Sequence, residues 1–359
     1  MDKNFMDVYT DYLISSFSTV SATGLSQLLD NNISHDKITR FLSNETFTSK
    51  DFWKLVKPFI RKHKEEDAVI VIDDTILEKP YTDENEIISW HFDHTKGRNV
   101  KGANIVTGIY CTNIVKLPFS FEIIKKDEKY IDEESGKEKR RSNKTKNEIF
   151  REIVLIGNKN IKIFKYVLSD NWYSTSENME LIEKLKKYFI FSVKSNRLIA
   201  LSEEDKKSGR FKQISEIGLE PNTVYHCYLR GVNFPLLAGK QVFKNKDGSE
   251  GVLYLVSNDL SLNYKEMTTI YKRRWKVEEY HESVKQNTGL GKSPTRTVVT
   301  QSNHFFASIY AFVKLEILSF KSRGNHYKLK HMLYLKALRE SFNELKALKN
   351  ELKYKCCVT

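Results

Sequence analysis

Residues 68–75 have the sequence AVIVIDDT, and this short stretch decides the fold of the central part of the chain. Its unbroken run of Ala, Val and Ile is typical of a β-strand that other elements cover on both faces. The run closes on Asp73 and Asp74, and open α/β sheets tend to gather catalytic groups at the carboxyl ends of their strands. An Asp after a strand is also a common turn former or helix cap, so these carboxylates alone do not establish a site.

After this stretch, the sequence predicts two more strands and then alternating helices and strands. Two strand candidates are close enough to form a hairpin or meander, and alternating helices and strands come after them. We predict strands at 103–113 and 115–124, a helix at 143–157, a strand at 163–170, a helix at 174–187 and a strand at 188–194. This order is typical of a mixed sheet with helices on its faces. The charged segment 125–147 is predicted to be a solvated loop.

The remaining segments have different patterns. Residues 200–258 alternate strand signals with Gly, Asn and Asp, and KNKDGSEG at 244–251 fits a hairpin turn. A long helix is predicted at 263–287, because Asn263 and Glu266 form a start signal and Gly289 a stop signal. Residues 301–359 are predicted to be helical.

Composition narrows the class of protein. The chain has 359 residues, of which 40% are apolar, and a net charge of +13, so it has enough apolar residues for a core and wholesale disorder is excluded. Its apolar runs are shorter than the about 18 residues that are needed to cross a bilayer, and its first residues lack the apolar central segment of a signal peptide. We therefore expect no membrane association and a cytoplasmic, nucleoid-associated location. The four cysteines form neither a disulfide framework nor a zinc pattern; they are Cys111, Cys227, Cys356 and Cys357.

The positive charge is concentrated near the end of the chain. Residues 321–359 contain ten basic and three acidic side chains, a net charge of +7, whereas residues 1–60 contain six basic and seven acidic ones, a net charge of −1. A polyanion is the natural partner of a basic surface. The alternative interpretation is that the positive charge only keeps the protein soluble and binds no polyanion.

The segment SATGLSQLLDNNISHDKITRFLSN at 21–44 resembles a helix-turn-helix. Ser34 is the predicted N-cap of its second helix, which would present Lys37 and Arg40 to DNA. Helix pairs of this size are also common in helical domains that bind no DNA.

The long helix predicted at 263–287 contains a mixed polar stripe. Tyr271, Arg274, Glu278 and Lys285 lie within about 60° of one another at 100° per residue. An aromatic ring, two cations and a carboxylate suit a surface that meets a phosphate beside a metal, although an exposed helix with an ordinary Arg274–Glu278 pair has the same pattern. Glu282 lies near the same stripe, so helical geometry does not choose between Glu278 and Glu282.

The sequence YKRRWKVEEYHESVK at 271–285 resembles the Y-x2-R-x3-E-x6-K signature of bacterial insertion-sequence transposases of the DDE type, the branch numbered family four. The signature places Glu278, not Glu282, at its acidic position. The IDDT sequence resembles the family's first-aspartate strand and points to Asp74, the residue directly before Thr75. The LSDNWYS sequence resembles the second-aspartate motif and points to Asp170. The resemblance spans about residues 65–320.

The resemblance implies a chemistry that suits these residues. Three carboxylates without a His or Cys cluster are hard ligands for Mg²⁺ or Mn²⁺, and two such ions about 4 Å apart could activate the attacking oxygen and stabilise the leaving oxygen of a phosphodiester. Asp74, Asp170 and Glu278 are the expected catalytic and metal-binding residues. The resemblance assigns Tyr271, Arg274 and Lys285 to holding the DNA end.

The resemblance also implies an architecture of five parts. We expect a ribonuclease-H-like α/β domain with a mixed sheet and flanking helices, interrupted by a β-rich insert. The expected parts are a helical DNA-binding region at 1–65, the first catalytic segment at 66–199, the insert at 200–258, the completion of the catalytic domain at 259–320 and a basic helical region at 321–359.

The expected function is cut-and-paste DNA transposition on terminal repeats, carried out by a homodimer. A C-terminal helix with Leu345, Leu348 and Leu352 on one face is a candidate dimer contact, and packing on the catalytic domain is its alternative. A nuclease that cannot join strands, and a DNA-binding regulator or inactive derivative, are the alternative functions. The insert contains no Trp, so the use of a hairpin DNA intermediate stays open; Tyr225, Tyr228 or Phe234 could stack a base there.

Overall fold

The computed structural model describes residues 1–356 apart from 95, 135 and 245–246, with side chains up to residue 350. It contains two compact units, Thr48–His281 and Met1–Phe47 with Glu282–Thr359. Cys357, the side chain of Leu352 and two residues of the predicted turn at 244–251 lie outside the described residues. The division of the chain into five parts stays a prediction.

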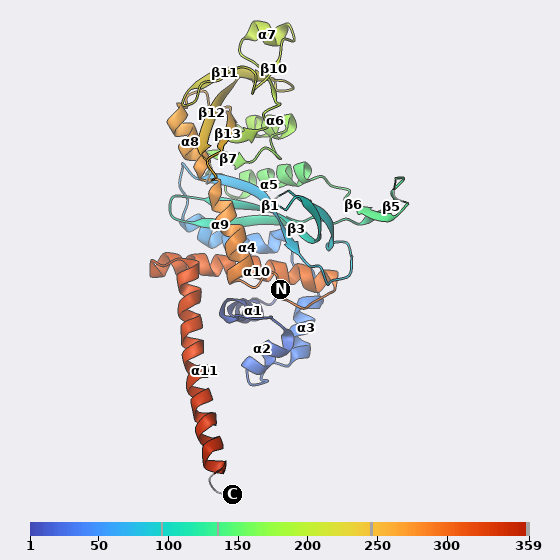
Figure 1. The fold of residues 1–359 in the computed structure, drawn as a ribbon, viewed down its shortest axis with the longest axis vertical. Helices are drawn as coiled ribbons and strands as arrows, with labels where there is room; N and C mark the ends of the chain where they lie inside the picture. Colours follow the sequence, from blue (N-terminus) through green and yellow to red (C-terminus); the bar gives the residue numbers. More distant parts are fainter. Residues whose placement is uncertain (95, 135, 245–246, 357–359) are drawn as a thin grey trace. The chain divides into compact units, whose positions relative to one another are not determined.

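The unit Thr48–His281 contains one mixed sheet of 11 strands (Figure 1). Its central strands are β1 (Val69–Glu78), β3 (Arg98–Cys111), β4 (Lys116–Ile123), β7 (Tyr166–Ser169) and β8 (Tyr188–Val193). β1 pairs antiparallel with β3 and parallel with β7, β3 pairs antiparallel with β4, and β7 pairs parallel with β8. The order β4-β3-β1-β7-β8 confirms the predicted ribonuclease-H-like sheet. The short strand β2 (Ser89–Asp93) also pairs with β3.

The strands of the predicted insert extend this same sheet. β13 pairs antiparallel with β8, and the sheet continues through β12, β11 and β9 to β10. Residues 200–258 are therefore rich in strands, as predicted, and their sheet is continuous with the central one. The strands are β9 (Leu198–Ala200), β10 (Lys212–Gln213), β11 (Val224–Leu229), β12 (Leu236–Lys244) and β13 (Glu250–Ser257), with a short helix α7 (Glu203–Lys207) between β9 and β10.

Helices cover both faces of the central strands. Figure 1 shows α5 (Lys146–Asn160) on one side of the sheet and α4 (Ser49–Lys62) on the other. Both begin at a capping box, which ties the first turn to the preceding Thr side chain. The approach of α5 to the sheet requires Gly108 on β3, since a Cβ there would lie 2.4 Å from Ile153. The helix α6 (Ser176–Lys184) follows β7 and packs against α5.

The charged segment 125–147 contains a hairpin, so its prediction as a loop was wrong. β5 (Glu128–Ile131) and β6 (Glu138–Arg141) pair antiparallel with each other. Ion pairs across the hairpin, such as Arg141–Glu128 at 2.8 Å, support strands that no hydrophobic pattern marks. The exposed strand residues explain why periodicity did not find it.

The helix predicted at 263–287 is two helices, α8 (Tyr264–Lys272) and α9 (Trp275–Asn287). The predicted cap at Asn263 is confirmed, because its side chain accepts a hydrogen bond from Glu266 N and Glu266 returns one. At the break the backbone N–H groups of Arg273 and Arg274 donate to Ile270 and Tyr271, three residues earlier, and the two arginine side chains make separate tertiary contacts. Arg273 binds the carbonyl oxygen of Asp67 at 2.6 Å, and Arg274 binds Asp73 at 3.3 Å. The stripe calculated for a continuous helix is therefore interrupted at Arg273 and Arg274, although Arg274 still contacts Glu278.

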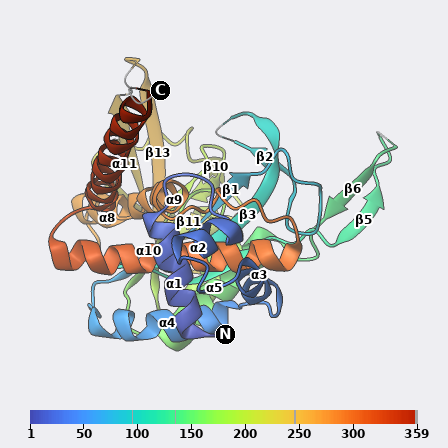
Figure 2. The same cartoon turned by 90° about the horizontal axis from the view of Figure 1, so that it is seen from below.

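The other unit is helical, as predicted for both ends of the chain. Helices α1 and α3 pack against α10, as Figure 2 shows from below. Polar contacts fix this packing, including Tyr9 Oη to His304 Nδ1 at 3.0 Å and three hydrogen bonds between the Asn303 side chain and the backbone of residues 42–47. The helices are α1 (Lys3–Ser15), α2 (Ala22–Leu28), α3 (His35–Ser43), α10 (Val298–Ser322) and α11 (His326–Cys356).

The predicted helix pair at the start of the chain is present as α2 and α3. Ser34 caps α3 by accepting a hydrogen bond from Lys37 N, as predicted. Lys37 and Arg40 are exposed. In α11, Leu345 and Leu348 are about half exposed, and their role as a dimer contact stays a prediction. Among the described residues, no helix is long and apolar enough to cross a membrane.

Candidate active site

Two adjacent aspartates lie in the middle of β1 and face opposite sides of the sheet, because side chains alternate along a strand. The side chain of Asp74 points to the face that α5 covers. Its Oδ2 accepts a hydrogen bond from Lys146 Nζ at 2.7 Å, and its Oδ1 accepts one from the Tyr173 hydroxyl at 2.8 Å. Burial raises the pKa of Asp74, but the charge and hydrogen bonds of these partners outweigh it, so the pKa lies below its ordinary value.

Asp73 has the opposite electrostatic environment. Its Oδ1 accepts a hydrogen bond from the backbone N–H of Asp74 at 2.9 Å, and its Oδ2 lies 3.3 Å from Arg274 Nη1. Burial and then the negative charges of Asp170 and Asp74 raise the pKa of Asp73 well above its ordinary value, despite the attraction of Arg274. Asp73 therefore belongs to a group of carboxylates that repel one another.

Asp170 directly follows β7, the strand beside β1. The backbone N–H of Trp172 donates to its Oδ1 at 3.0 Å, which holds the carboxyl group at the start of the loop. Burial raises the pKa of Asp170, and the charge of Asp74 adds to this effect, whereas Arg274 opposes it. The middle of β1 and the carboxyl end of β7 thus bring Asp73 and Asp74 close enough to Asp170 for their charges to interact.

Arg274 connects this pair to the signature helix. It lies in the turn between α8 and α9, and its Nη1 contacts Asp73 at 3.3 Å and Glu278 Oε1 at 3.4 Å. Its side chain is 14% exposed, whereas that of Glu278 is 46% exposed. One cation therefore bridges a carboxylate of the sheet and a carboxylate of α9.

Tyr271 is buried, and its hydroxyl donates to the carbonyl oxygen of Ser169 at 3.4 Å. Ser169 is the residue before Asp170, so this hydrogen bond supports the position of the second aspartate. Lys37, Arg40 and Lys285 belong to the other unit of the chain.

Several residues of this site were not found from the sequence. Lys146 lies in the charged segment 125–147, which was predicted only as a loop. Tyr173 lies in the LSDNWYS motif, but no function was predicted for it. The exposed ring of Trp172 lies between Lys146 and Lys194, with each Nζ within 5.8 Å of its centroid. In the sequence, only the positions of Trp172 and Tyr173, two and three residues after Asp170, indicated that they could belong to the site.

The chemistry of the carboxylates fits a divalent metal ion. Two half-buried aspartates, Asp73 and Asp170, have raised pKa values and repel each other, and a hard cation would relieve this repulsion. Arg274 supplies positive charge between Asp73 and Glu278 in this arrangement. Over the described part of the chain, no three His, Cys, Asp or Glu side chains are already arranged as ligands of one ion. His91 is buried, and its Nε2 lies 3.1 Å from Ser89 Oγ.

Two family models match this sequence. Residues 2–210 match a model described as "DDE superfamily endonuclease", and residues 136–313 match one described as "Transposase DDE domain". No curated protein matches the sequence.

Two solved structures show weak similarity to the chain. A chain of the "Drosophila P element transposase strand transfer complex" is 10% identical, with a TM-score of 0.24, and the match covers 52% of this chain and 36% of that one. A chain of the "mariner Mos1 paired end complex with Mg" is 7% identical, with a TM-score of 0.18, over 46% of this chain and 52% of that one. The match thus spans about a third to a half of the length of those chains.

Proposed function

The chain belongs to the DDE superfamily of endonucleases, and from this membership we propose that it is a DNA transposase that cuts and rejoins DNA strands. The observation that carries the proposal is the gathering of carboxylates from three elements. Arg274 contacts both Asp73 and Glu278, and the charge of Asp170 acts on Asp73. The proposed reaction is cut-and-paste transposition on terminal repeats, as in insertion-sequence family four.

We propose Asp73, Asp170 and Glu278 as the metal-binding carboxylates. Asp74 was expected from its position before Thr75, and the contacts of the two side chains favour Asp73. Asp74 is already neutralised by Lys146 and hydrogen-bonded by Tyr173 on the opposite face of the sheet. Asp73 faces Arg274, which also binds Glu278.

The proposed cofactor is Mg²⁺ or Mn²⁺, and the proposed number of ions is two. Such an ion, when bound, supplies a Lewis acid for the attacking and leaving oxygens of a phosphodiester. The protein residues hold the acidic groups in place: the Trp172 N–H orients Asp170, and Tyr271 supports the preceding carbonyl group. Arg274 balances the negative charge of Asp73 and Glu278 and can also attract a DNA phosphate.

The proposed DNA contacts are Arg274 and Lys285 from the signature, and Lys37 and Arg40 from α3. The exposure of Lys37 and Arg40 supports their part of this proposal. The burial of Tyr271 supports a positioning role instead of the direct DNA contact expected from the signature. A homodimer is proposed because two transposon ends must be joined in one reaction.

The experiment is cleavage of a labelled duplex that carries the element's own terminal repeat, with and without Mg²⁺. We expect metal-dependent nicking at the repeat boundary by the wild type and its loss in Glu278→Gln. Glu282→Gln is the matched control, since Glu282 lies four residues further along α9, is exposed, and accepts a hydrogen bond from Gln286. The control should cleave at the wild-type rate.

Strand-transfer products on a two-ended substrate distinguish a transposase from a nuclease that only cuts. Sequence-specific binding by folded wild-type protein without any cleavage would contradict the proposed activity. That result would favour a DNA-binding regulator or an inactive derivative.

A further inference from the structure

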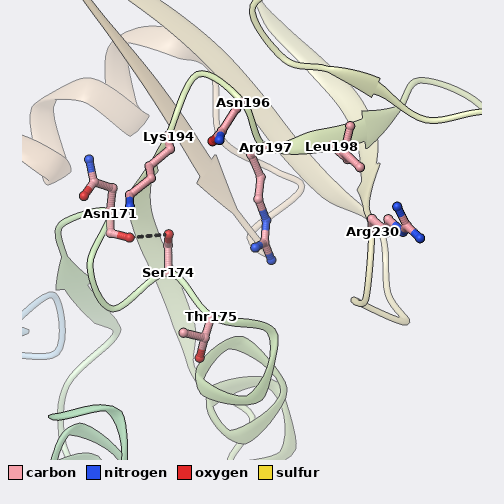
Figure 3. A pocket seen from close by; sticks show the side chains of 8 residues that line it. All are labelled: Asn171, Ser174, Thr175, Lys194, Asn196, Arg197, Leu198 and Arg230. Carbon is pink, nitrogen blue, oxygen red and sulfur yellow. Dashed lines mark hydrogen bonds between the residues drawn. The ribbon is translucent and has the colours of Figure 1, made fainter. Parts of the chain in front are cut away.

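A cavity of about 390 Å³ opens beside the second aspartate, at the ends of β7, β8 and β11 (Figure 3). This volume is near the lower end of the range for ligand pockets, about 300–1,000 Å³. Asn171, the residue after Asp170, forms part of its wall. Three basic residues line it from two segments: Lys194 and Arg197 follow β8, and Arg230 follows β11.

The lining of the cavity is strongly cationic. None of its described lining residues is acidic, and only Leu198 is apolar. Lys194, Arg197 and Arg230 form no ion pair with any residue that the structure describes, although Glu177 attracts Arg197 from beyond ion-pair distance. Like charges that are held together repel one another unless an anion lies between them. The cavity therefore suits an anionic group.

Arg197 has an unused hydrogen-bond donor. Its Nη2 donates to Ser176 Oγ at 3.2 Å, but its Nε is buried without a hydrogen-bond partner. A buried donor without a partner is costly, so an acceptor is expected for it. Burial also lowers the pKa of Arg197, and the negative charge of Glu177 opposes this effect. Guanidinium groups bind phosphate through two parallel hydrogen bonds.

The start of α6 adds a third feature. Figure 3 shows the Arg197 side chain extending toward the loop that carries Ser174 and Thr175, and Thr175 is the N-cap of the nine-residue helix α6. The partial positive charge at a helix N-terminus favours a nearby anion. Thr175 Oγ1 already accepts a hydrogen bond from Asn178 N, so the helix start adds only partial positive charge near the pocket.

We propose that this pocket binds a backbone phosphate of the DNA strand that passes the acidic site. This inference rests on the proposed function for the identity of the polymer. No aromatic ring lines the pocket itself, but the exposed ring of Trp172 lies beside Lys194, where it could stack a base of the same strand. The adjacency of Asn171 to Asp170 places the phosphate one residue along the chain from the proposed metal ligands.

The test measures DNA affinity without metal, so it does not depend on cleavage. Fluorescence anisotropy with a labelled duplex in EDTA gives the association constant between 50 and 200 mM salt. Each lost phosphate contact makes the negative slope of log K against log salt shallower by about 0.9, so the loss of affinity over this fourfold salt range is about 3.5 times smaller. We expect this change for Lys194→Gln and for Arg230→Gln, both at exposed positions that should tolerate it.

Lys184→Gln is the matched control, because Lys184 is an exposed cation at the opposite end of α6. Its slope should equal that of the wild type. Wild-type slopes in both Lys194→Gln and Arg230→Gln would overturn the proposal. Binding of free 5′-dTMP that these variants lose, with an unchanged DNA slope, would also overturn it in favour of a nucleotide site.

The outcomes for the pocket and for the proposed function are distinguishable. A changed slope in a protein that never cleaves would support the pocket and contradict the transposase activity. Normal cleavage with unchanged slopes would contradict the pocket alone.

Discussion

Replacing Asp74 with asparagine should destabilise the unit Thr48–His281, whereas the same replacement of Asp73 should not. Asp74 is 14% exposed and bonds Lys146, which is 27% exposed. Removing one partner of a fully buried ion pair costs about 3–5 kcal/mol, and exposed pairs contribute about 0–1 kcal/mol. Because Lys146 still reaches water and asparagine can still accept the Tyr173 hydrogen bond, we expect a loss of about 2 kcal/mol.

Asp73→Asn removes a charge that the fold disfavours. The pKa of Asp73 is raised, so its ionised form at pH 7 lowers the stability relative to the unfolded chain. Arg274 loses one carboxylate but keeps Glu278 at 3.4 Å. We therefore expect equal or higher stability, together with loss of metal-dependent cleavage.

Thermal unfolding in EDTA at pH 7, followed by circular dichroism, measures both variants. A loss of 2 kcal/mol corresponds to a decrease of about 4–8 °C in the unfolding temperature of a unit of this size. The pKa of Asp74 is lowered from 3.8, so its stabilisation is complete above that pH and is lost as the pH falls through the folded value. The difference between the wild type and Asp74→Asn should thus shrink in acid. An equal loss of stability in both variants, or loss of cleavage only in a folded Asp74→Asn protein, would refute the assignment of Asp73.

Two other predictions concern stability. Gly108→Ala should lower the free energy of unfolding, measured in urea, by about 1–3 kcal/mol, because the new Cβ would lie 2.4 Å from Ile153 and 2.8 Å from Phe119. Gly324→Ala is the control, since a Cβ there would have its nearest neighbour at 3.5 Å. An equal loss of stability in both variants would contradict the close approach of α5 to β3. Burial lowers the pKa of Lys330 to about 8 from 10.5, so the unfolded chain holds more protons between these values and stability should rise with pH there. Lys330→Met should remove this rise, and parallel pH profiles of the two proteins would count against it.

The order of elements was predictable because local patterns carry it. The unbroken apolar run of β1 marks a strand buried on both faces whatever surrounds it. Ser34 and Asn263 were recognised as caps because a side-chain acceptor satisfies free N–H groups of the next turn only. The hairpin β5–β6 was missed because its exposed residues have no periodic pattern.

The break between α8 and α9 was not predictable from the helix itself. Both sides of the break contain good helix-forming residues and a valid start signal. At the break, Arg273 and Arg274 bind groups about 200 residues earlier in the sequence. Contacts between residues so far apart in the sequence produce no local sequence pattern that could predict them.

The sequence by itself determined the class of fold and indicated Asp74, Asp170 and Glu278 as candidate site residues, because strand patterns and motif spacings are local properties. The tertiary structure alone distinguishes the partners of Asp73 from those of Asp74. Adjacent strand residues must face opposite sides of a sheet, but packing decides which side receives Lys146 and which receives Arg274. The basic pocket likewise exists only because β8 and β11 bring Arg197 and Arg230 together.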